Sequence, residues 1–188
     1  ALWGSCRLYG GSSVGYSHSG DVHSHFPRPY TLVASGYCMM FESSIISSLR
    51  ALADSSGIVG FFAVVAASYL PYLLVALAVF TIVRVRPPRM RLWSAVYVSL
   101  SALLARGIFA GALHVLWSRP RPFVALGFQP LVVVDPGASF PSGHVSLLAT
   151  LAVAVFAVNR RAGWWLGAGA LVVGIARMFS GVHWPSDI

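Results

Sequence analysis

Lysine is absent from this sequence of 188 residues and only five residues are acidic, so the formal net charge of +8 comes from arginine alone. The arginines stand in short groups between apolar runs and form no basic face or tail. They therefore indicate membrane topology and argue against nucleic-acid binding. Cysteine is also scarce: Cys6 and Cys38 are the only two, and their spacing does not predict whether they form a bridge.

Charged residues make up only 10% of the chain, whereas hydrophobic residues make up 57% and the mean hydropathy is +0.75. A soluble domain seldom has so little charge and so much apolar surface to bury. The composition therefore favours a protein embedded in a bilayer.

Residues 1–40 differ from the rest of the chain, because they are rich in glycine, serine and histidine and show no hydrophobic periodicity. We predict a disordered or non-native leader here. The histidines of this segment, His18, His23 and His25, could hold a metal, but the polar low-complexity composition favours an unstructured segment. No basic region followed by an apolar core is present, which argues against a signal peptide. The pair Met39-Met40 precedes the first patterned segment, and our hypothesis is that the natural protein begins there.

The hydrophobic pattern after the leader predicts an all-α fold, a polytopic bundle of helices in a membrane. Residues 41–56 predict an amphipathic helix at the membrane interface, since apolar residues recur at helical spacing with serines opposite them. Residues 57–188 form the predicted membrane-embedded domain. Its four expected spanning helices are the apolar runs at 58–83, 92–117, 145–158 and 163–180. Pro71 is expected to kink the first of them.

Two arginine-rich hairpins set the predicted orientation in the membrane. By the positive-inside rule, residues 84–91 and 159–161 lie in the cytoplasm. Residues 118–144 and 181–187 are then both on the outer face. Arg106 falls in the middle of the second predicted span, where a charge is costly and usually faces a bundle interior or a water-filled cavity.

Two of the outward segments carry groups suited to an anion. His114 is followed by Arg119-Pro120-Arg121-Pro122, in which two guanidinium groups offer forked, charged donors for phosphate oxygens. The turn at 139–144 (SFPSGH) leads into the third apolar run, so Ser142 is predicted near the N-cap of a helix whose first N–H groups can bind an anion. His144 lies in the first turn of that helix. Taken alone, an Arg-Pro repeat more often anchors to headgroups, and a capped helix with an interfacial histidine is ordinary.

The third outward segment combines a cation, an imidazole and a carboxylate: Arg177, His183 and Asp187, at spacings of six and four residues. Gly181 is expected to end the fourth apolar helix and to leave His183 in a loop. Asp187 follows at a distance from which a carboxylate can bind and orient the imidazole. A lone histidine and aspartate at this spacing would more often form an ordinary polar contact.

Together the outward segments suit phosphoryl transfer through a covalent phosphohistidine. Guanidinium and backbone N–H groups neutralise the phosphoryl oxygens, one imidazole attacks, and the other protonates the leaving oxygen. No cluster of carboxylates able to hold Mg²⁺ occurs after the leader, so we predict a reaction that needs no metal or other cofactor. The non-enzymatic alternative is a protein that only grips lipid headgroups, such as a flippase or an assembly factor. It would need the arginines but not two histidines and an aspartate at these spacings.

In their order along the chain, the three segments resemble the signature of the type 2 phosphatidic-acid phosphatase superfamily, which includes the vanadium haloperoxidases. The matching residues are Arg121-Pro122, Pro141 to His144, Arg177, His183 and Asp187. The resemblance implies that His183 is the nucleophile, that Asp187 orients it and that His144 is the general acid. It also implies a phosphate site made by Arg121, Arg177, Ser142 and the Gly143 backbone.

Two positions depart from the family signature: His114 stands where the family has lysine, and Ala176 where it often has serine. His114 and Arg119 complete the predicted phosphate site. Because a neutral imidazole supplies one donor and no charge, Arg119 or Arg106 is expected to compensate for the missing lysine. The family also continues into another spanning helix after the position of Ile188. We therefore expect this chain to be a C-terminally truncated fragment with low activity on its own.

Within the superfamily, the chain looks most like the bacterial undecaprenyl-diphosphate phosphatases of the bacitracin-resistance type. The similar stretches are RPRPF at 119–123, YLPYL at 69–73 and the amphipathic segment before the first span. This resemblance implies hydrolysis of undecaprenyl diphosphate to the monophosphate on the outer face of the cytoplasmic membrane, which recycles the lipid carrier of cell-wall peptidoglycan.

A phosphatidic-acid or phosphatidylglycerophosphate phosphatase is the alternative, because it would use the same groups on the same face. The implied partners are the lipid substrate and the bilayer, without nucleic acid. Formation of a homo-oligomer is left open by the sequence.

Overall fold

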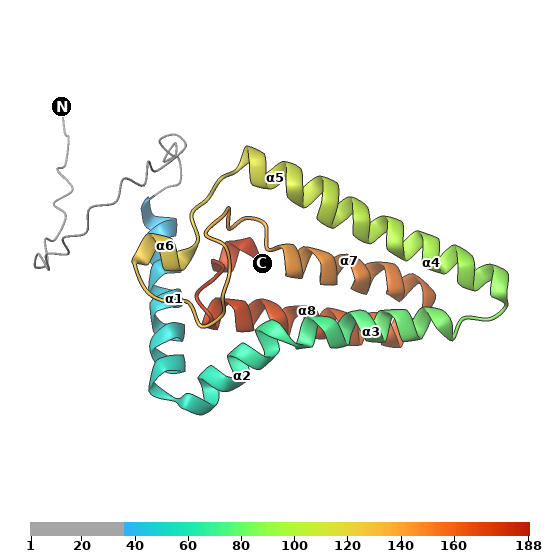
Figure 1. Cartoon of the computed structure of the whole chain (residues 1–188), viewed down its shortest axis with the longest axis horizontal. Helices are drawn as coiled ribbons and strands as arrows, with labels where there is room; N and C mark the ends of the chain where they lie inside the picture. Colours follow the sequence, from blue (N-terminus) through green and yellow to red (C-terminus); the bar gives the residue numbers. More distant parts are fainter. Residues whose placement is uncertain (1–35) are drawn as a thin grey trace, which may run out of the picture.

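The computed structural model describes residues 36–188, and all regular structure in this part is helical (Figure 1). The elements are α1 (Gly36–Ser55), α2 (Gly57–Ser68), α3 (Leu70–Val83), α4 (Pro88–Leu103), the π-helix η1 (Leu104–Phe109), α5 (Ala110–Leu116), α6 (Pro122–Leu126), α7 (Gly143–Val158), α8 (Arg160–Phe179) and the 3₁₀-helix η2 (Pro185–Asp187). The predicted all-α fold is confirmed. The histidine group of the predicted leader, His18, His23 and His25, lies outside the described residues.

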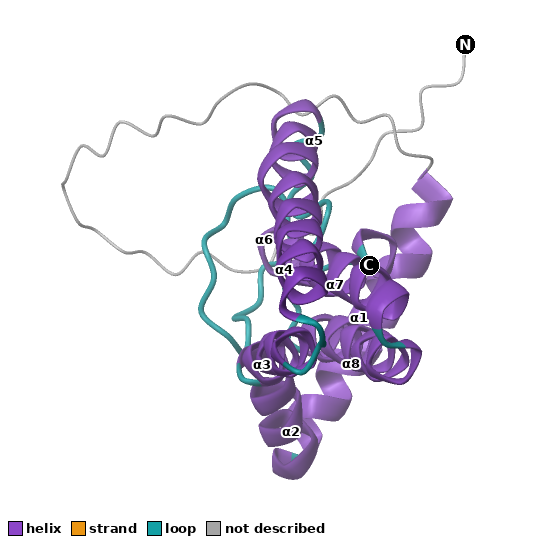
Figure 2. Ribbon diagram, turned by 90° about the vertical axis from the view of Figure 1, so that its right-hand side faces the viewer, coloured by secondary structure: helices purple, strands orange, loops and turns teal. Residues whose placement is uncertain are grey.

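The centre of the bundle is the hairpin of α7 and α8, joined at Asn159. Asn159 is the N-cap of α8, since its side-chain oxygen accepts a hydrogen bond of 3.1 Å from Ala162 N. Helices α2 and α3 pack against α8, and α4 packs against α7; Figure 2 shows α3, α4, α7 and α8 side by side in a second view. The buried core between them is apolar, and its larger members are Leu74, Val98, Leu148, Leu151, Val155, Leu166 and Val173.

Two helices of the described part are long and apolar enough to cross a membrane. They are the continuous helix formed by α4, η1 and α5, at Pro88–Leu116, and α8, at Arg160–Phe179. The pair of α1 and α2 also passes as a bent pair with an angle of 115°, which would bring the number to three. The expected count of four spans is not confirmed by helix length and composition.

The structure differs from the expected spans at two of the four apolar runs, 58–83 and 145–158. The predicted span at 58–83 is divided at Tyr69 into α2 and α3, and α7 has 16 residues. Pro71 lies in the first turn of α3. Proline has no N–H to bond back to the preceding helix and its ring disfavours helical backbone just before it, so the helix is interrupted near the expected kink.

Helix α1 contains residues 41–55 of the predicted amphipathic segment 41–56, and it also packs against the bundle. In Figure 1 it crosses one end of the bundle, and it packs against α2, α6 and α8. One face of the helix is buried against them: Glu42, Ile46 and Ala53 are 4%, 0% and 4% exposed. An acidic side chain on this buried face needs a partner of opposite charge.

Large apolar side chains cover the outside of the long helices. Ile108 and Phe109 are 59% and 65% exposed, and Trp164 and Trp165 of α8 are 72% and 71% exposed. A soluble monomer rarely leaves so much contiguous apolar surface open, whereas lipid chains would cover it. The outer surface therefore agrees with the membrane protein that the composition predicts.

We predict that Gly163→Ala destabilises the hairpin of α7 and α8. A methyl group at residue 163 would lie 2.5 Å from Phe156 Cα and 2.8 Å from Phe156 N, which forces the helices apart. Overpacking of this kind costs about 1–3 kcal/mol. The measurement is the thermal unfolding of the full-length protein in detergent, followed by circular dichroism.

The matched control is Gly167→Ala, four residues further along the same helix. Its added methyl group would meet only Ala152 Cβ at 3.9 Å, an ordinary contact, so the transition temperature should be unchanged or raised. Equal transition temperatures for the two variants would contradict the close packing described here.

Candidate active site

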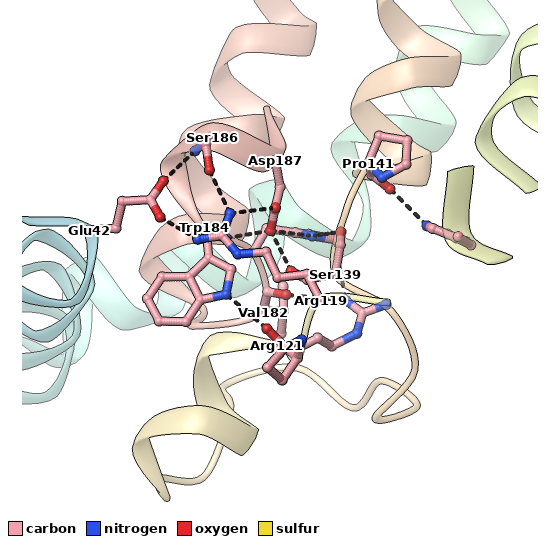
Figure 3. Close-up of polar contacts among 12 residues, drawn as sticks. Glu42, Arg119, Arg121, Ser139, Pro141, Val182, Trp184, Ser186 and Asp187 are labelled. Atoms are coloured by element: carbon pink, nitrogen blue, oxygen red, sulfur yellow. Dashed lines mark hydrogen bonds and ion pairs between the residues drawn. The ribbon is translucent and has the colours of Figure 1, made fainter. Parts of the chain in front are cut away.

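Three segments that are far apart in the sequence meet at one end of the bundle, where α7 begins and α8 ends (Figure 3). Backbone hydrogen bonds join them directly. Ser139 N donates to Arg119 O at 2.8 Å, and Ser142 N donates to Asp187 O at 3.0 Å. The segments that carry the predicted site residues therefore lie together, as a single site requires.

Gly181 ends α8 and sends the chain back across the end of the bundle. Its φ of +72° is in the left-handed region that favours glycine, its N–H donates to Met178 O at 2.9 Å, and Val182 N donates to Arg177 O at 3.2 Å. The predicted helix end is confirmed. His183 consequently lies in the loop after α8, and Asp187 is the last residue of η2.

Asp187 is buried, with 4% exposure, and both of its carboxylate oxygens are bound. Oδ2 accepts hydrogen bonds from Ser139 Oγ and, at 2.7 Å, from Trp184 N, while Oδ1 accepts from Arg119 Nη1 at 3.3 Å. Burial alone would raise the pKa of Asp187, but the nearby His183 imidazole and hydrogen bonds from Ser139 and Trp184 hold this pKa below its ordinary value. The side chain is therefore a carboxylate at neutral pH.

His183 is also buried, with 2% exposure, and its two ring nitrogens have different surroundings. Nδ1 lies 3.0 Å from Ser139 O and 3.6 Å from Asp187 Oδ2. Because both neighbours are acceptors, Nδ1 carries the proton and Nε2 keeps a lone pair. Nε2 lies 3.4 Å from Nη1 of Arg121, a cation.

The imidazole of His183 is neutral at pH 7. Burial lowers its pKa, the interaction with the Asp187 carboxylate partly offsets this, and the charges of Arg121 and Arg177 lower the pKa further. A buried, neutral imidazole with a lone pair next to a cation can attack an electrophile that brings negative charge.

Ser142 and His144 flank Gly143, the first residue of α7. Ser142 is fully buried, and its Oγ has no hydrogen-bond partner among the residues that the structure describes. His144 is exposed and precedes the apolar stretch 145–158. Partial desolvation lowers the pKa of His144 to about 4, and the nearby arginines Arg177, Arg106 and Arg121, together with His183, contribute to this. Several cationic groups thus surround the start of α7.

Arg121 and Arg177 each use one terminal nitrogen to hold a backbone carbonyl. Arg121 Nη1 donates to Val182 O and Arg177 Nη1 to Ala67 O, each at 3.2 Å. The Nε of both side chains is buried and has no partner within residues 36–188. Arginine offers five N–H donors, so both side chains retain donors for an anion.

Arg119 is engaged by protein carboxylates. Nη2 pairs with Glu42, and Nη1 donates to Ser186 Oγ at 2.6 Å and to Asp187 Oδ1 at 3.3 Å. Glu42 also accepts a hydrogen bond of 3.2 Å from Ser186 N. Arg119 thus links α1 to the segment around Asp187 (Figure 3), and its phosphate-binding role stays a prediction that would have to use its remaining N–H groups.

His114 meets the second segment from the end of α5. Its Nε2 lies 3.0 Å from Pro141 O, so this nitrogen donates to the carbonyl and holds the turn against α5. A ring nitrogen used in this way cannot also bind an anion. The phosphate-binding role of His114 stays a prediction that would have to use Nδ1.

Two residues of the site, Glu42 and Ser139, were not among the expected ones. Ser139 lies inside the predicted turn, but its hydroxyl looked no different from other loop serines. Glu42 carried a usable signal, because it stands four residues before Ile46 on the apolar face of an amphipathic helix. An acidic side chain on such a face predicts a buried ionic partner.

No three side chains of the types histidine, cysteine, aspartate and glutamate gather into a possible metal site within residues 36–188. The metal-independent reaction stays a prediction.

The fold and the site define a class of membrane-helical protein that presents a cationic site with a buried His–Asp pair at the end of its bundle. The chain belongs to the PAP2 superfamily, whose family model matches residues 94–188, just over half of the sequence. The resemblance drawn from the three motifs is confirmed.

Three curated relatives are similar to this chain. The undecaprenyl-diphosphatase BcrC of Bacillus subtilis is 34% identical over 76 residues, 40% of this chain and 39% of that protein. The bacitracin transport permease protein BcrC of Bacillus licheniformis is 32% identical over 124 residues, 65% of this chain and 59% of that protein. An undecaprenyl-diphosphatase of Sulfolobus acidocaldarius is 35% identical over 74 residues, 37% of this chain and 34% of that protein. The chain thus spans less than two thirds of each relative.

We predict that Glu42→Gln destabilises the protein by about 1–3 kcal/mol, because the Arg119 guanidinium loses a buried charged partner. The matched control is Asp54→Asn on the same helix. Asp54 is 56% exposed and pairs with Arg50 at 3.0 Å, a surface pair that contributes at most about 1 kcal/mol. Thermal unfolding in detergent measures both variants. An effect of Glu42→Gln no larger than that of Asp54→Asn would refute the buried link.

Proposed function

We propose that the protein is a membrane lipid phosphatase that transfers a phosphoryl group first to His183 and then to water. The observation that carries this proposal is the geometry of His183. Its Nδ1 faces two acceptors, Ser139 O at 3.0 Å and Asp187 Oδ2 at 3.6 Å, and its Nε2 presents a lone pair beside the Arg121 guanidinium. Membership of the PAP2 superfamily supports the same reaction class.

In the first step, His183 Nε2 attacks the terminal phosphorus of the lipid. An N–P bond forms while the bond between phosphorus and the lipid-bearing oxygen breaks, and that oxygen takes a proton from His144. The anionic phosphate offsets the cations that lower the pKa of His144, so substrate binding favours the protonated form that acts as the acid. Asp187 stabilises the positive charge that His183 gains.

In the second step, water attacks the phosphohistidine. His144, now neutral, takes a proton from the water, the N–P bond breaks, and inorganic phosphate leaves. Through both steps the phosphoryl oxygens are held by the donors at the start of α7 and by two arginines: Ser142 Oγ, Gly143 N–H, Arg121 and Arg177. Fixed donors of this kind stabilise charge that develops in the transition state.

For the substrate we propose undecaprenyl diphosphate, a polyprenyl diphosphate that is cleaved to the monophosphate. Two relatives bear the name undecaprenyl-diphosphatase, and a third is a BcrC protein, which supports this choice and the link to lipid-carrier recycling and bacitracin resistance. A glycerolipid monophosphate would use the same catalytic groups, so the assay below includes one.

For the topology we propose four crossings, with α2 and α3 acting together as one, and a site on the outer face of the cytoplasmic membrane. The arginine-rich turns at 84–91 and 159–161 would be cytoplasmic. Figure 1 supports this arrangement, since the turn between α3 and α4 and the turn between α7 and α8 both lie at the end of the bundle away from α6.

We predict that the full-length protein, purified in detergent, releases inorganic phosphate from undecaprenyl diphosphate in the presence of EDTA. His183→Ala should lower kcat by about 10³-fold or more, because the covalent route is lost. Arg161→Gln, at the opposite end of the bundle, is the control that should retain activity. Phosphatidic acid, assayed in parallel, should be the poorer substrate.

The outcomes separate the parts of the proposal. Activity that disappears in EDTA would refute the metal-free mechanism, and activity that survives in His183→Ala would refute the nucleophile. Faster turnover of phosphatidic acid would move the proposal to glycerolipids. Binding of both lipids without phosphate release would favour the headgroup-gripping alternative.

We also predict a trapped phosphohistidine. A diphosphate substrate labelled at its terminal phosphate should label the protein after a rapid quench, and the label should be lost in acid but kept in base. His183→Ala should not be labelled. Label at the same level in this variant would contradict attack by His183.

A further inference from the structure

Arg106 occupies an unfavourable place for a charged side chain. It lies in the interior of the span Pro88–Leu116, ten residues before its end. Its side chain is exposed, and within residues 36–188 it forms no hydrogen bond or ion pair. A cation at membrane depth is costly unless it faces a polar cavity or finds a counter-charge. Its position therefore calls for an anionic partner.

The helix that carries Arg106 is distorted at this residue. Between α4 and α5 the backbone forms the π-helix η1, Leu104–Phe109, and η1 packs against α7. A π-helical turn inserts a residue into the α-helical pattern and changes the direction of the neighbouring side chains, and such turns are frequent at functional sites.

The Arg106 guanidinium lies directly against Gly143 at the start of α7. A methyl group on residue 143 would be 2.7 Å from Arg106 Nε, 2.8 Å from Cζ and 3.0 Å from Nη2, so only glycine allows this approach without displacing the side chain. The N-terminus of α7 is itself the positive end of a helix dipole. Two positive groups pressed together are stabilised when an anion binds both of them.

The other predicted phosphate ligands of this region are placed differently. Arg119 is bound to Glu42 and Asp187, and His114 donates to Pro141 O. Arg121 and Arg177 flank His183 and act on its pKa. Arg106 also acts on the pKa of His144, which agrees with its placement beside the start of α7.

We propose that Arg106 is a phosphate-binding residue of this site, an inference that rests on the lipid-phosphatase function proposed above. Its guanidinium contacts the phosphate held by the N-terminus of α7 and neutralises part of the negative charge. This gives the membrane-embedded charge its counter-ion and supplies a permanent cation near the start of α7.

The test compares Arg106→Gln, Arg106→Lys and the control Arg89→Gln in the full-length protein. Arg89 is exposed in the first turn of α4, at the opposite end of the same long helix. Calorimetry with inorganic phosphate measures binding without turnover, and kcat and KM are measured with undecaprenyl diphosphate. Loss of a charged hydrogen bond should weaken phosphate binding and raise KM by about 10- to 100-fold in Arg106→Gln.

Arg106→Lys should recover part of the lost phosphate affinity, because lysine keeps the positive charge but lacks the paired N–H donors of the guanidinium. Arg89→Gln should match the parent protein, and the exposed position of Arg106 predicts unchanged thermal unfolding in all variants. A purely structural role would instead lower the unfolding temperature without a selective loss of phosphate affinity.

Phosphate affinity and KM of Arg106→Gln equal to those of the parent would overturn the inference, as would a parent protein that binds no inorganic phosphate. If the parent binds phosphate but turns over neither lipid, the lipid-phosphatase function fails. The comparison of affinities then still decides the role of Arg106.

Discussion

The rest of the site depends on the buried carboxylate of Asp187. An ionised carboxylate is costly to bury unless hydrogen bonds and counter-charges surround it. Asp187 obtains them from Ser139, from Trp184 N and from Arg119, which belong to three separate segments. Satisfying one charge thus holds three loops in a single arrangement. The same arrangement places Ser139 O and Asp187 Oδ2 on the Nδ1 side of His183, and this leaves Nε2 with its lone pair.

The arginines near the start of α7 divide into two groups by their partners. Arg119 is paired with carboxylates on both sides and connects α1 to the segment around Asp187. Arg121 and Arg177 hold backbone carbonyls, have no carboxylate partner and keep donors free, and Arg106 has no partner in the described part of the chain. Arginines 119 and 121 are separated by one proline, yet one stabilises the fold and the other faces the imidazole. Neighbouring positions therefore differ in function because the buried carboxylates neutralise one of the two charges.

The sequence predicted what depends on local pattern. The helix start after Ser142, the helix end at Gly181 and the His183–Asp187 pairing all rest on residues within a few positions of one another, where turn chemistry and helical spacing decide the geometry. It did not predict the link between Glu42 and Arg119, which are 77 residues apart and meet only after the bundle has folded. The break at Tyr69 was only partly anticipated, because hydropathy counts Pro71 as one residue of an apolar run and does not register the lost backbone hydrogen bond.

Unsatisfied donors at the start of α7 explain why the free site should bind an anion strongly. Ser142 Oγ, Arg121 Nε and Arg177 Nε are buried without a hydrogen-bond partner in residues 36–188, and each such group destabilises the folded protein. A bound phosphate would accept hydrogen bonds from these donors and reduce the repulsion among the cations. Binding would then recover part of the folding free energy that these unpaired donors cost. It would recover more as negative charge builds on the phosphoryl oxygens. In the proposed reaction, donors placed in this way would stabilise the transition state more than the ground state, which is the condition for catalysis.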